Sequence, residues 1–117
     1  MKWLLQAEGA ALFAASLVAF HVLDTSWWMY AVLFFVPDVA FAAYLGGPRI
    51  GAAAYNLLHS TIGPIVLAGA AWWTGGILGQ VLVSVAVIWF GHVGFDRMLG
   101  YGLKYTSGFK NTHLGKL

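Results

Sequence analysis

Residues 77–96 have the sequence ILGQVLVSVAVIWFGHVGFD, and this stretch decides the class of fold. It carries no charged side chain before its last residue, Asp96. A helix needs roughly 20 mostly apolar residues to cross a hydrocarbon core about 30 Å thick. Three stretches closer to the N-terminus meet the same criterion: residues 3–23, 27–45 and 51–73. We therefore expect four membrane-spanning helices.

The composition of the whole chain agrees with a membrane protein. Of its 117 residues, 61% are hydrophobic and only 9% are charged, whereas about a quarter of the residues of a soluble domain are charged. The high apolar content argues against a disordered chain, and the absence of basic clusters argues against nucleic acid as a partner. Because there is no cysteine, a disulfide scaffold is excluded, and a metal site would have to use other ligands.

The positions of the cations predict the topology. Short connections between the four stretches force neighbouring helices to be antiparallel, and small residues such as Gly9 permit close helix contacts. All six cations then fall on one side: Lys2, Arg49, Arg97, Lys104, Lys110 and Lys116. The positive-inside rule places that side, and both termini, in the cytoplasm. We expect an all-α polytopic protein, with an antiparallel four-helix bundle in residues 1–98 and a polar cytoplasmic tail in residues 99–117.

Polar side chains inside the predicted spans are the candidate functional residues. An acidic or basic group at the centre of a span costs roughly 2.5–3.5 kcal/mol, so such groups usually have a role. Counted from the cytoplasmic ends, the candidates of all four spans fall in one layer of the cytoplasmic half of the membrane. Their positions are Glu8, Asp38, Asn56, His59, His92 and Asp96.

The spacing within this layer indicates a metal site. His92 and Asp96 are four residues apart and project from one helix face, as do Asn56 and His59, three apart. Two imidazoles with carboxylates and no thiolate suit Zn, Mn or Fe, with Mg less favoured. A bound cation would also neutralise the buried acids. The alternative is that these polar groups only form hydrogen bonds between helices, and the sequence leaves both open.

The tail after residue 98 leaves two alternatives as well. Its glycines and polar residues begin directly below the polar layer, so it would be able to fold back and bring Lys104 or His113 to the site. Otherwise it is a solvated basic segment attracted to anionic lipids.

Several segments carry a resemblance to a known family. YNLLHS at residues 55–60, HVGFDR at 92–97 and GYGLKY at 100–105 resemble a small bacterial integral membrane family catalogued as domain of unknown function 4260. That resemblance implies a multi-pass protein of the bacterial cytoplasmic membrane and no particular activity.

The order of polar residues is also similar to that of the membrane-bound metal-dependent hydrolases. On that similarity, Asp38, His59, His92 and Asp96 would be metal ligands. The chain departs from that pattern around His59, where Leu58 and Ser60 replace the Arg before the histidine and the Thr-His pair typical of those proteins.

Two functions from different classes follow. In the first, a metal-dependent hydrolase acts on an amphiphilic or lipid-like substrate, with Glu8 or Asp38 as general base or as ligand of a second metal ion, and with Arg97 or Lys104 binding an anionic headgroup. In the second, the chain is a non-enzymatic accessory or assembly subunit of a larger membrane complex, or a homo-oligomer. A proton or ion path is less favoured, because the outer half of the predicted spans lacks a matching series of polar groups.

Overall fold

The computed structural model describes residues 2–38, 45–100, 111–112 and 115–116. These residues form five helices and one antiparallel pair of two-residue strands. The helices are α1 (Lys2–Leu23), α2 (Trp27–Leu33), α3 (Pro48–His59), α4 (Ile62–Thr74) and α5 (Gly76–Met98), and the strands are β1 (Asn111–Thr112) and β2 (Gly115–Lys116). The expected helical fold class is confirmed.

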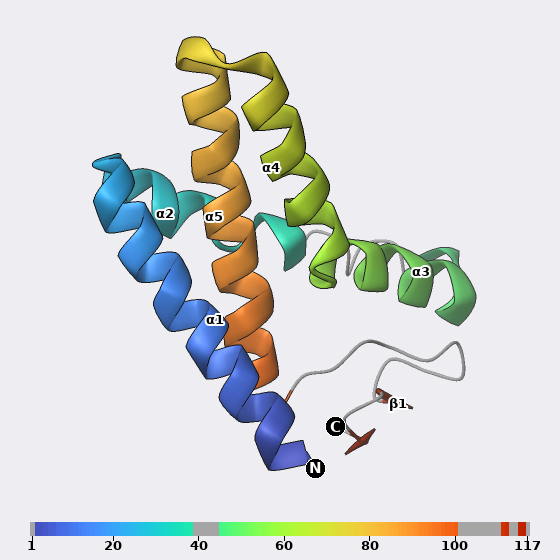
Figure 1. The fold of residues 1–117 in the computed structure, drawn as a ribbon. Coiled ribbons are helices and arrows are strands. Elements are labelled where there is room, and N and C mark those ends of the chain that lie inside the picture. Colours follow the sequence, from blue (N-terminus) through green and yellow to red (C-terminus); the bar gives the residue numbers. More distant parts are fainter. Residues whose placement is uncertain (1, 39–44, 101–110, 113–114, 117) are drawn as a thin grey trace.

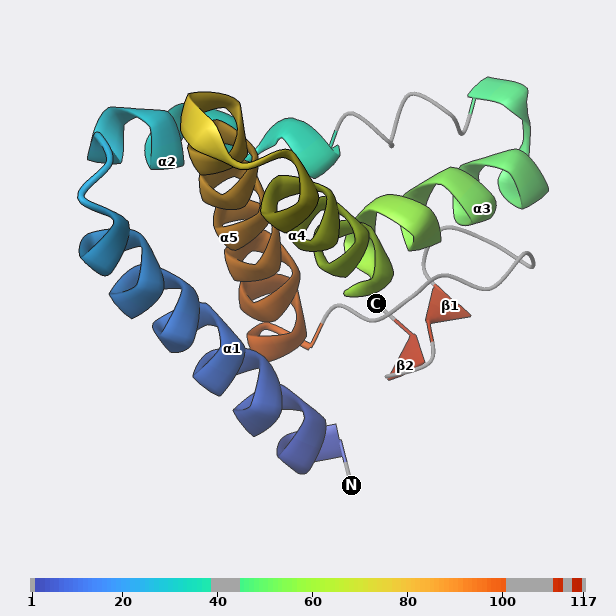
Figure 2. The same cartoon turned by 45° about the horizontal axis from the view of Figure 1, so that its top comes forward.

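Helix α5 is the central element of the fold. It lies between α1 and α4, and a turn at Gly75 connects it to α4 (Figures 1 and 2). Its residues from Gly91 to Gly94 are all buried, and two of them are glycines that allow neighbouring backbones to approach. A Cβ at Gly94 would lie 2.7 Å from the carbonyl oxygen of Gly9, so α1 and α5 meet here without an intervening side chain.

Two helices are long and apolar enough to cross a membrane by themselves, namely α1 and α5. Helices α3 and α4 pass the same test only together, and they are bent by 47° at their junction. The described residues therefore contain two candidate spans, or three if the bent pair is one span, as expected of a membrane protein.

The junction between α3 and α4 replaces the single helix predicted for residues 51–73. Helix α3 ends at His59, and Ser60 has an extended backbone. Pro64, in the first turn of α4, lacks the N–H that would bond to the carbonyl of Ser60 in a continuous helix. The proline is tolerated in a first turn, and the chain changes direction just before it.

The region predicted as a second span also differs. Helix α2 ends at Leu33, and a turn of 3₁₀-helix follows at residues 36–38. Because Pro37 cannot donate a hydrogen bond to the carbonyl of Leu33, the α-helix ends there and does not continue to residue 45 as predicted. Residues 39–44 lie outside the described part of the chain.

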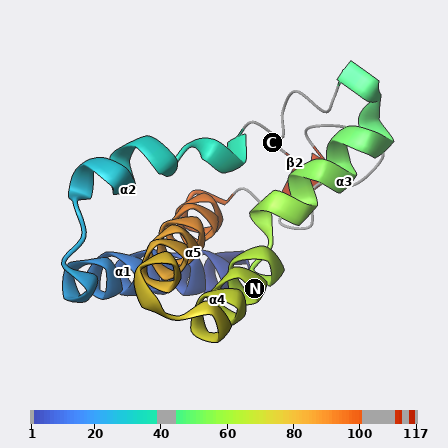
Figure 3. The same cartoon turned by 90° about the horizontal axis from the view of Figure 1, so that it is seen from above.

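Helix α2 runs across α5 rather than alongside it (Figures 1 and 3). It is attached by an aromatic core in which Tyr30 and Phe34 pack with Phe20 of α1 and Ile88 of α5. Within the described residues, an antiparallel four-helix bundle is therefore not confirmed.

A buried hydrogen-bond chain fixes the same contact. Ser16 donates to the carbonyl of Val87 (2.6 Å), and the hydroxyl of Tyr30 donates in turn to Ser16 (2.9 Å). These bonds join α1, α2 and α5, and the chain leaving α2 carries Asp38 back towards α5.

Candidate metal centre

Four residues from three separate segments meet beside α5. Asp38 lies in the 3₁₀ turn after α2, His59 is the last residue of α3, and His92 and Asp96 lie one turn apart on α5. One nitrogen or carboxylate oxygen from each lies within 4.8 Å of the other three. This His₂Asp₂ group could hold a metal ion, and it contains the four ligands that the sequence predicts.

Five of the six distances within the group are close to those of a tetrahedral site, and the sixth, between the two carboxylate oxygens, is at most 4.8 Å. The Nε2 of His59 lies 3.2 Å from Oδ1 of Asp38 and 3.3 Å from Oδ2 of Asp96. The Nε2 of His92 lies at the same two distances from the same two oxygens. The two Nε2 atoms are 3.0 Å apart. Ligands bound tetrahedrally at about 2.0–2.1 Å lie about 3.3–3.4 Å from one another, so these five separations approach the ligand spacing of a zinc-type site.

The hydrogen bonding of His59 leaves its Nε2 available as a ligand. Its Nδ1 lies 2.9 Å from the carbonyl oxygen of Tyr55, which can only accept, so Nδ1 carries the proton. In the neutral ring, Nε2 then carries a lone pair that is directed at the cluster. The Tyr55 ring stacks on the imidazole with centroids 3.8 Å apart and thereby fixes its orientation. Such orientation by neighbouring groups is typical of metal-binding histidines.

His92 is held by packing. Its ring meets the Phe34 ring edge to face at 5.0 Å, and its side chain is 2% exposed. Among the described residues, its buried Nδ1 makes no hydrogen bond of standard geometry. The ring is therefore positioned by the aromatic core that attaches α2.

Burial decreases from one side of the group to the other. The side chain of His59 is 0% exposed and that of Asp96 is 11% exposed, whereas Asp38 is 35% exposed. The histidines and Asp96 form a closed base, and Asp38 forms the accessible side. A small molecule would reach the group past Asp38.

The junction between α3 and α4 is held by two side chains of α5. Trp89 donates from Nε1 to the carbonyl of Leu58 (2.6 Å), and Arg97 donates from Nη2 to the carbonyl of His59 (2.7 Å). Carbonyls at the C-terminus of a helix have no partner within that helix, so α5 satisfies them. One helix therefore carries two of the four candidate ligands and positions a third.

Sequence reasoning missed the supporting roles of Trp89 and Tyr55. Their spacing would have been the available indication: Trp89 lies three residues before His92 and Tyr55 four before His59, each on the face of its histidine. Arg97 was predicted as a headgroup-binding residue, and the structure places it at the end of α3.

The other predicted site residues lie apart from the group. Glu8 is exposed on α1 and lines a separate cavity of about 350 Å³ together with Ser60, Thr61 and Arg97. Asn56 is half-buried on α3, three residues before His59, and is not one of the four. Lys104 and His113 lie outside the described residues.

Fold and site together define a small helical protein whose described residues contain candidate membrane spans and a candidate metal centre built from two histidines and two aspartates. The sequence profile of a family described as a domain of unknown function (DUF4260) matches residues 2–117. The chain belongs to this family. Neither a curated protein nor a solved structure matches it, and the similarity to membrane-bound metal-dependent hydrolases stays a prediction.

Proposed function

We propose that this chain is an integral membrane protein that binds one divalent metal ion through His59, His92 and Asp96 and uses it to hydrolyse an amphiphilic substrate. Asp38 lies at the open side of the ion, as a fourth ligand or as the general base. The observation that carries the proposal is the convergence of four ligand atoms within 4.8 Å of one another, with the histidine–histidine and all four histidine–aspartate separations at 3.0–3.3 Å.

The electrostatics of the group favour a cation at its centre. Nε2 of His59 and one carboxylate oxygen each of Asp38 and Asp96 point into one small volume, where each would be attracted to a cation. A divalent ion neutralises the two carboxylates and offsets the cost of carrying acidic residues into a membrane, roughly 2.5–3.5 kcal/mol each. Two protonated imidazoles would balance the charge equally, but they would bring two N–H donors to 3.0 Å from each other.

The donor set narrows the choice of metal. Two imidazole nitrogens and two carboxylate oxygens suit Zn, Mn or Fe, and Mg is less favoured because it prefers oxygen ligands alone. A divalent ion with an open position lowers the pKa of its bound water to near neutrality and polarises a phosphoryl or acyl oxygen. The graded burial supports such a position beside Asp38, whose carboxylate would accept the proton of the attacking water.

The membrane context supports an amphiphilic substrate. With the cationic side of the chain in the cytoplasm of a bacterial cell, the ligands lie in the cytoplasmic half of the inner membrane. At that depth a catalytic group meets the headgroup linkage of a lipid. We therefore propose membrane lipids or related amphiphiles as partners. Lys104, which lies outside the described residues, stays a predicted contact for an anionic headgroup.

Metal analysis tests the proposal most directly. The protein is purified in detergent, and its metal content is measured for wild type, His59→Ala, His92→Ala and the control His21→Ala, an exposed histidine on α1. About one ion per chain is expected in wild type and control, with loss in the two site variants. Absence of metal from wild type after growth and purification with Zn, Mn and Fe, or unchanged content in the site variants, would overturn the proposal.

Activity is tested on the same samples. The metal-loaded protein in vesicles is expected to release phosphate or fatty acid from single-chain phospholipids, and the metal-free protein is not. Restoration of release by added metal in wild type, but not in His92→Ala, would separate this activity from a contaminating hydrolase. A metal-loaded wild type that hydrolyses neither phosphoester nor carboxylic ester would contradict the catalytic part of the proposal.

A second candidate function is that of a non-enzymatic subunit with a structural metal. It is favoured by the fourth ligand, because sites with four protein ligands are usually structural, and Asp38, His59 and α5 come from three segments that such an ion would tie together. Co-purification from native membranes with a larger complex, combined with full metal content and no hydrolysis, would favour this function. A chain that runs alone in mild detergent and hydrolyses lipid would exclude it.

A further inference from the structure

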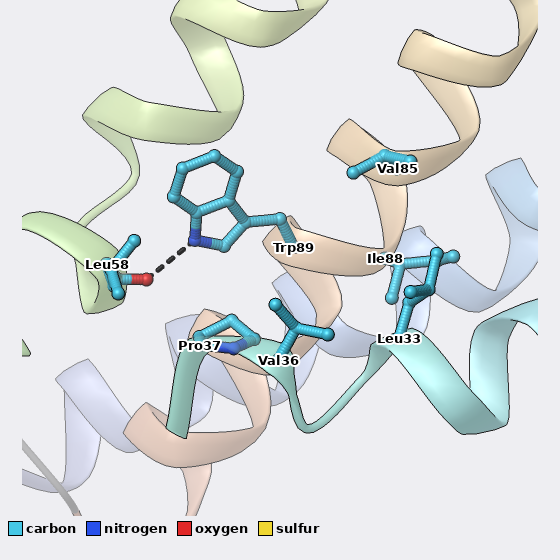
Figure 4. A pocket seen from close by; sticks show the side chains of 7 residues that line it. All are labelled: Leu33, Val36, Pro37, Leu58, Val85, Ile88 and Trp89. Atoms are coloured by element: carbon cyan, nitrogen blue, oxygen red, sulfur yellow. Dashed lines mark hydrogen bonds between the residues drawn. The ribbon is translucent and has the colours of Figure 1, made fainter. Parts of the chain in front are cut away.

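An apolar cavity of about 190 Å³ adjoins the candidate metal centre. It opens between the end of α2, the end of α3 and the middle of α5 (Figure 4). Its lining residues are Leu33, Val36, Pro37, Leu58, Val85, Ile88 and Trp89.

The cavity and the metal centre share their supporting segments. Pro37 directly precedes Asp38, and Leu58 directly precedes His59. On α5, Trp89 and Ile88 lie three and four residues before His92, on the same helix face. All three segments that supply metal ligands therefore also supply a wall of the cavity.

The direction from the centre to the cavity runs along α5. Val85 and Trp89 precede His92 by seven and three residues, which corresponds to about 10 Å and about 5 Å along the helix axis. If the metal centre lies near the cytoplasmic end of α5, the cavity extends from it towards the middle of the bilayer. This is the direction in which the chain of a membrane-inserted amphiphile points.

The lining admits only an apolar occupant. Six of the seven side chains are aliphatic, and the indole N–H of Trp89 is already bonded to the carbonyl of Leu58 (2.6 Å, Figure 4). A water molecule needs two to four polar partners, and these side chains offer none. The volume equals roughly six water-sized groups of about 30 Å³ each, which suits part of one hydrocarbon chain and not two side by side.

We propose that this cavity binds the hydrocarbon chain of a single-chain amphiphile and thereby places the polar linkage of that molecule at the open, Asp38 side of the metal centre. The inference rests on the proposed function for the role of the metal, but the cavity is testable separately. Val36 and Val85 form opposite walls and set the length and thickness of chain that is accepted.

Binding of alkyl phosphonates with four to twelve carbons to the metal-loaded protein in nanodiscs tests the proposal. Affinity is expected to rise about three- to fourfold per methylene while the cavity fills, as for burial of apolar groups, and then to level off. In the Val85→Trp variant the larger side chain fills the cavity. Partitioning of the phosphonate into lipid is the same for both proteins, so it cancels in the ratio of wild-type to variant affinity. The control is Val81→Trp, one turn away on an exposed position of α5 outside the cavity. A ratio that does not change with chain length would overturn the proposal.

A second measurement does not depend on a folded variant or on metal. An alkanol with a terminal diazirine is crosslinked to wild-type protein with and without metal, and the labelled residues are identified by mass spectrometry. Labelling of the half-buried residues Val85 or Trp89 supports the cavity in either state, even if no metal is found and the proposed function fails. Labelling spread over exposed residues such as Val18 and Val22 of α1 would overturn the cavity proposal while leaving the metal centre intact.

Discussion

The guanidinium of Arg97 donates a hydrogen bond to the main-chain carbonyl of His59 at 2.7 Å. The bond joins the end of α5 to the end of α3. The backbone of the candidate ligand His59 is therefore held by Arg97, the residue that directly follows the candidate ligand Asp96. Neither helix alone would fix the distance between His59 and His92. The arrangement of the candidate ligands thus depends on contacts outside the four ligands themselves.

Replacing Arg97 is expected to weaken metal binding without removing a ligand. In Arg97→Gln the carbonyl of His59 loses its charged donor, and the end of α3 becomes free to move. Loss of such supporting contacts typically costs 10- to 100-fold in metal affinity. The affinity is measured by competition with a chromogenic chelator, and Arg49→Gln, at an exposed position of α3, is the control. Equal affinities for the two variants would contradict the positioning role.

Trp89 is expected to stabilise the junction between α3 and α4. Trp89→Phe keeps most of the aromatic volume but removes the indole N–H that bonds to Leu58, and an unsatisfied buried carbonyl costs about 1–3 kcal/mol. The variant should unfold at a lower temperature than wild type in detergent. Trp72→Phe, at an 86% exposed position of α4, should not. A Trp89→Phe variant as stable as wild type would show that water or lipid replaces the bond.

The contact between Gly9 and Gly94 is expected to tolerate no side chain. In Gly94→Ala the new Cβ would lie 2.7 Å from the carbonyl oxygen of Gly9 and 3.0 Å from the Cβ of Leu12, so α1 must move away from α5. Overpacking of this kind costs about 1–3 kcal/mol. Gly69→Ala is a matched control, because a Cβ at this position in α4 meets nothing within 4 Å. The first variant should lower the unfolding temperature, and the second should leave it equal or raise it. The same result for both would contradict the close contact.

The sequence predicted which residues form the candidate site better than it predicted the contacts around them. His92 and Asp96 are paired by helical spacing alone, and counting residues from the membrane surface brought Asp38 and His59 to the same depth. Counting also placed Glu8 at this depth, but the depth of a residue does not say which face of its helix it lies on. Gly9 faces α5, and its neighbour Glu8 is consequently exposed on the outside of α1.

The structure departs from the predicted fold for local reasons that a hydropathy pattern does not reveal. The apolar stretches around Pro37 and Pro64 are long enough to span a membrane, but each proline lacks one backbone donor, and the helix stops a few residues earlier. At the second break, α5 compensates through Trp89 and Arg97. Such compensation depends on which helix lies opposite, and a single sequence does not specify that.

Metal removal is expected to destabilise the whole fold, because the ion would join the turn after α2, the end of α3 and the C-terminal part of α5. A ligand that binds only the folded state adds about 2.7 kcal/mol at a free concentration 100 times its Kd. Dialysis against a chelator should therefore lower the unfolding temperature of wild type, and added Zn, Mn or Fe should restore it.

The Asp38→Asn variant separates two roles of the exposed ligand. If Asp38 is mainly a general base, metal-dependent stabilisation is retained and hydrolysis is lost. If Asp38 is mainly a structural ligand, stabilisation falls as well. In His59→Ala the chelator should have no effect, and a shift there as large as in wild type would place the ion elsewhere in the protein.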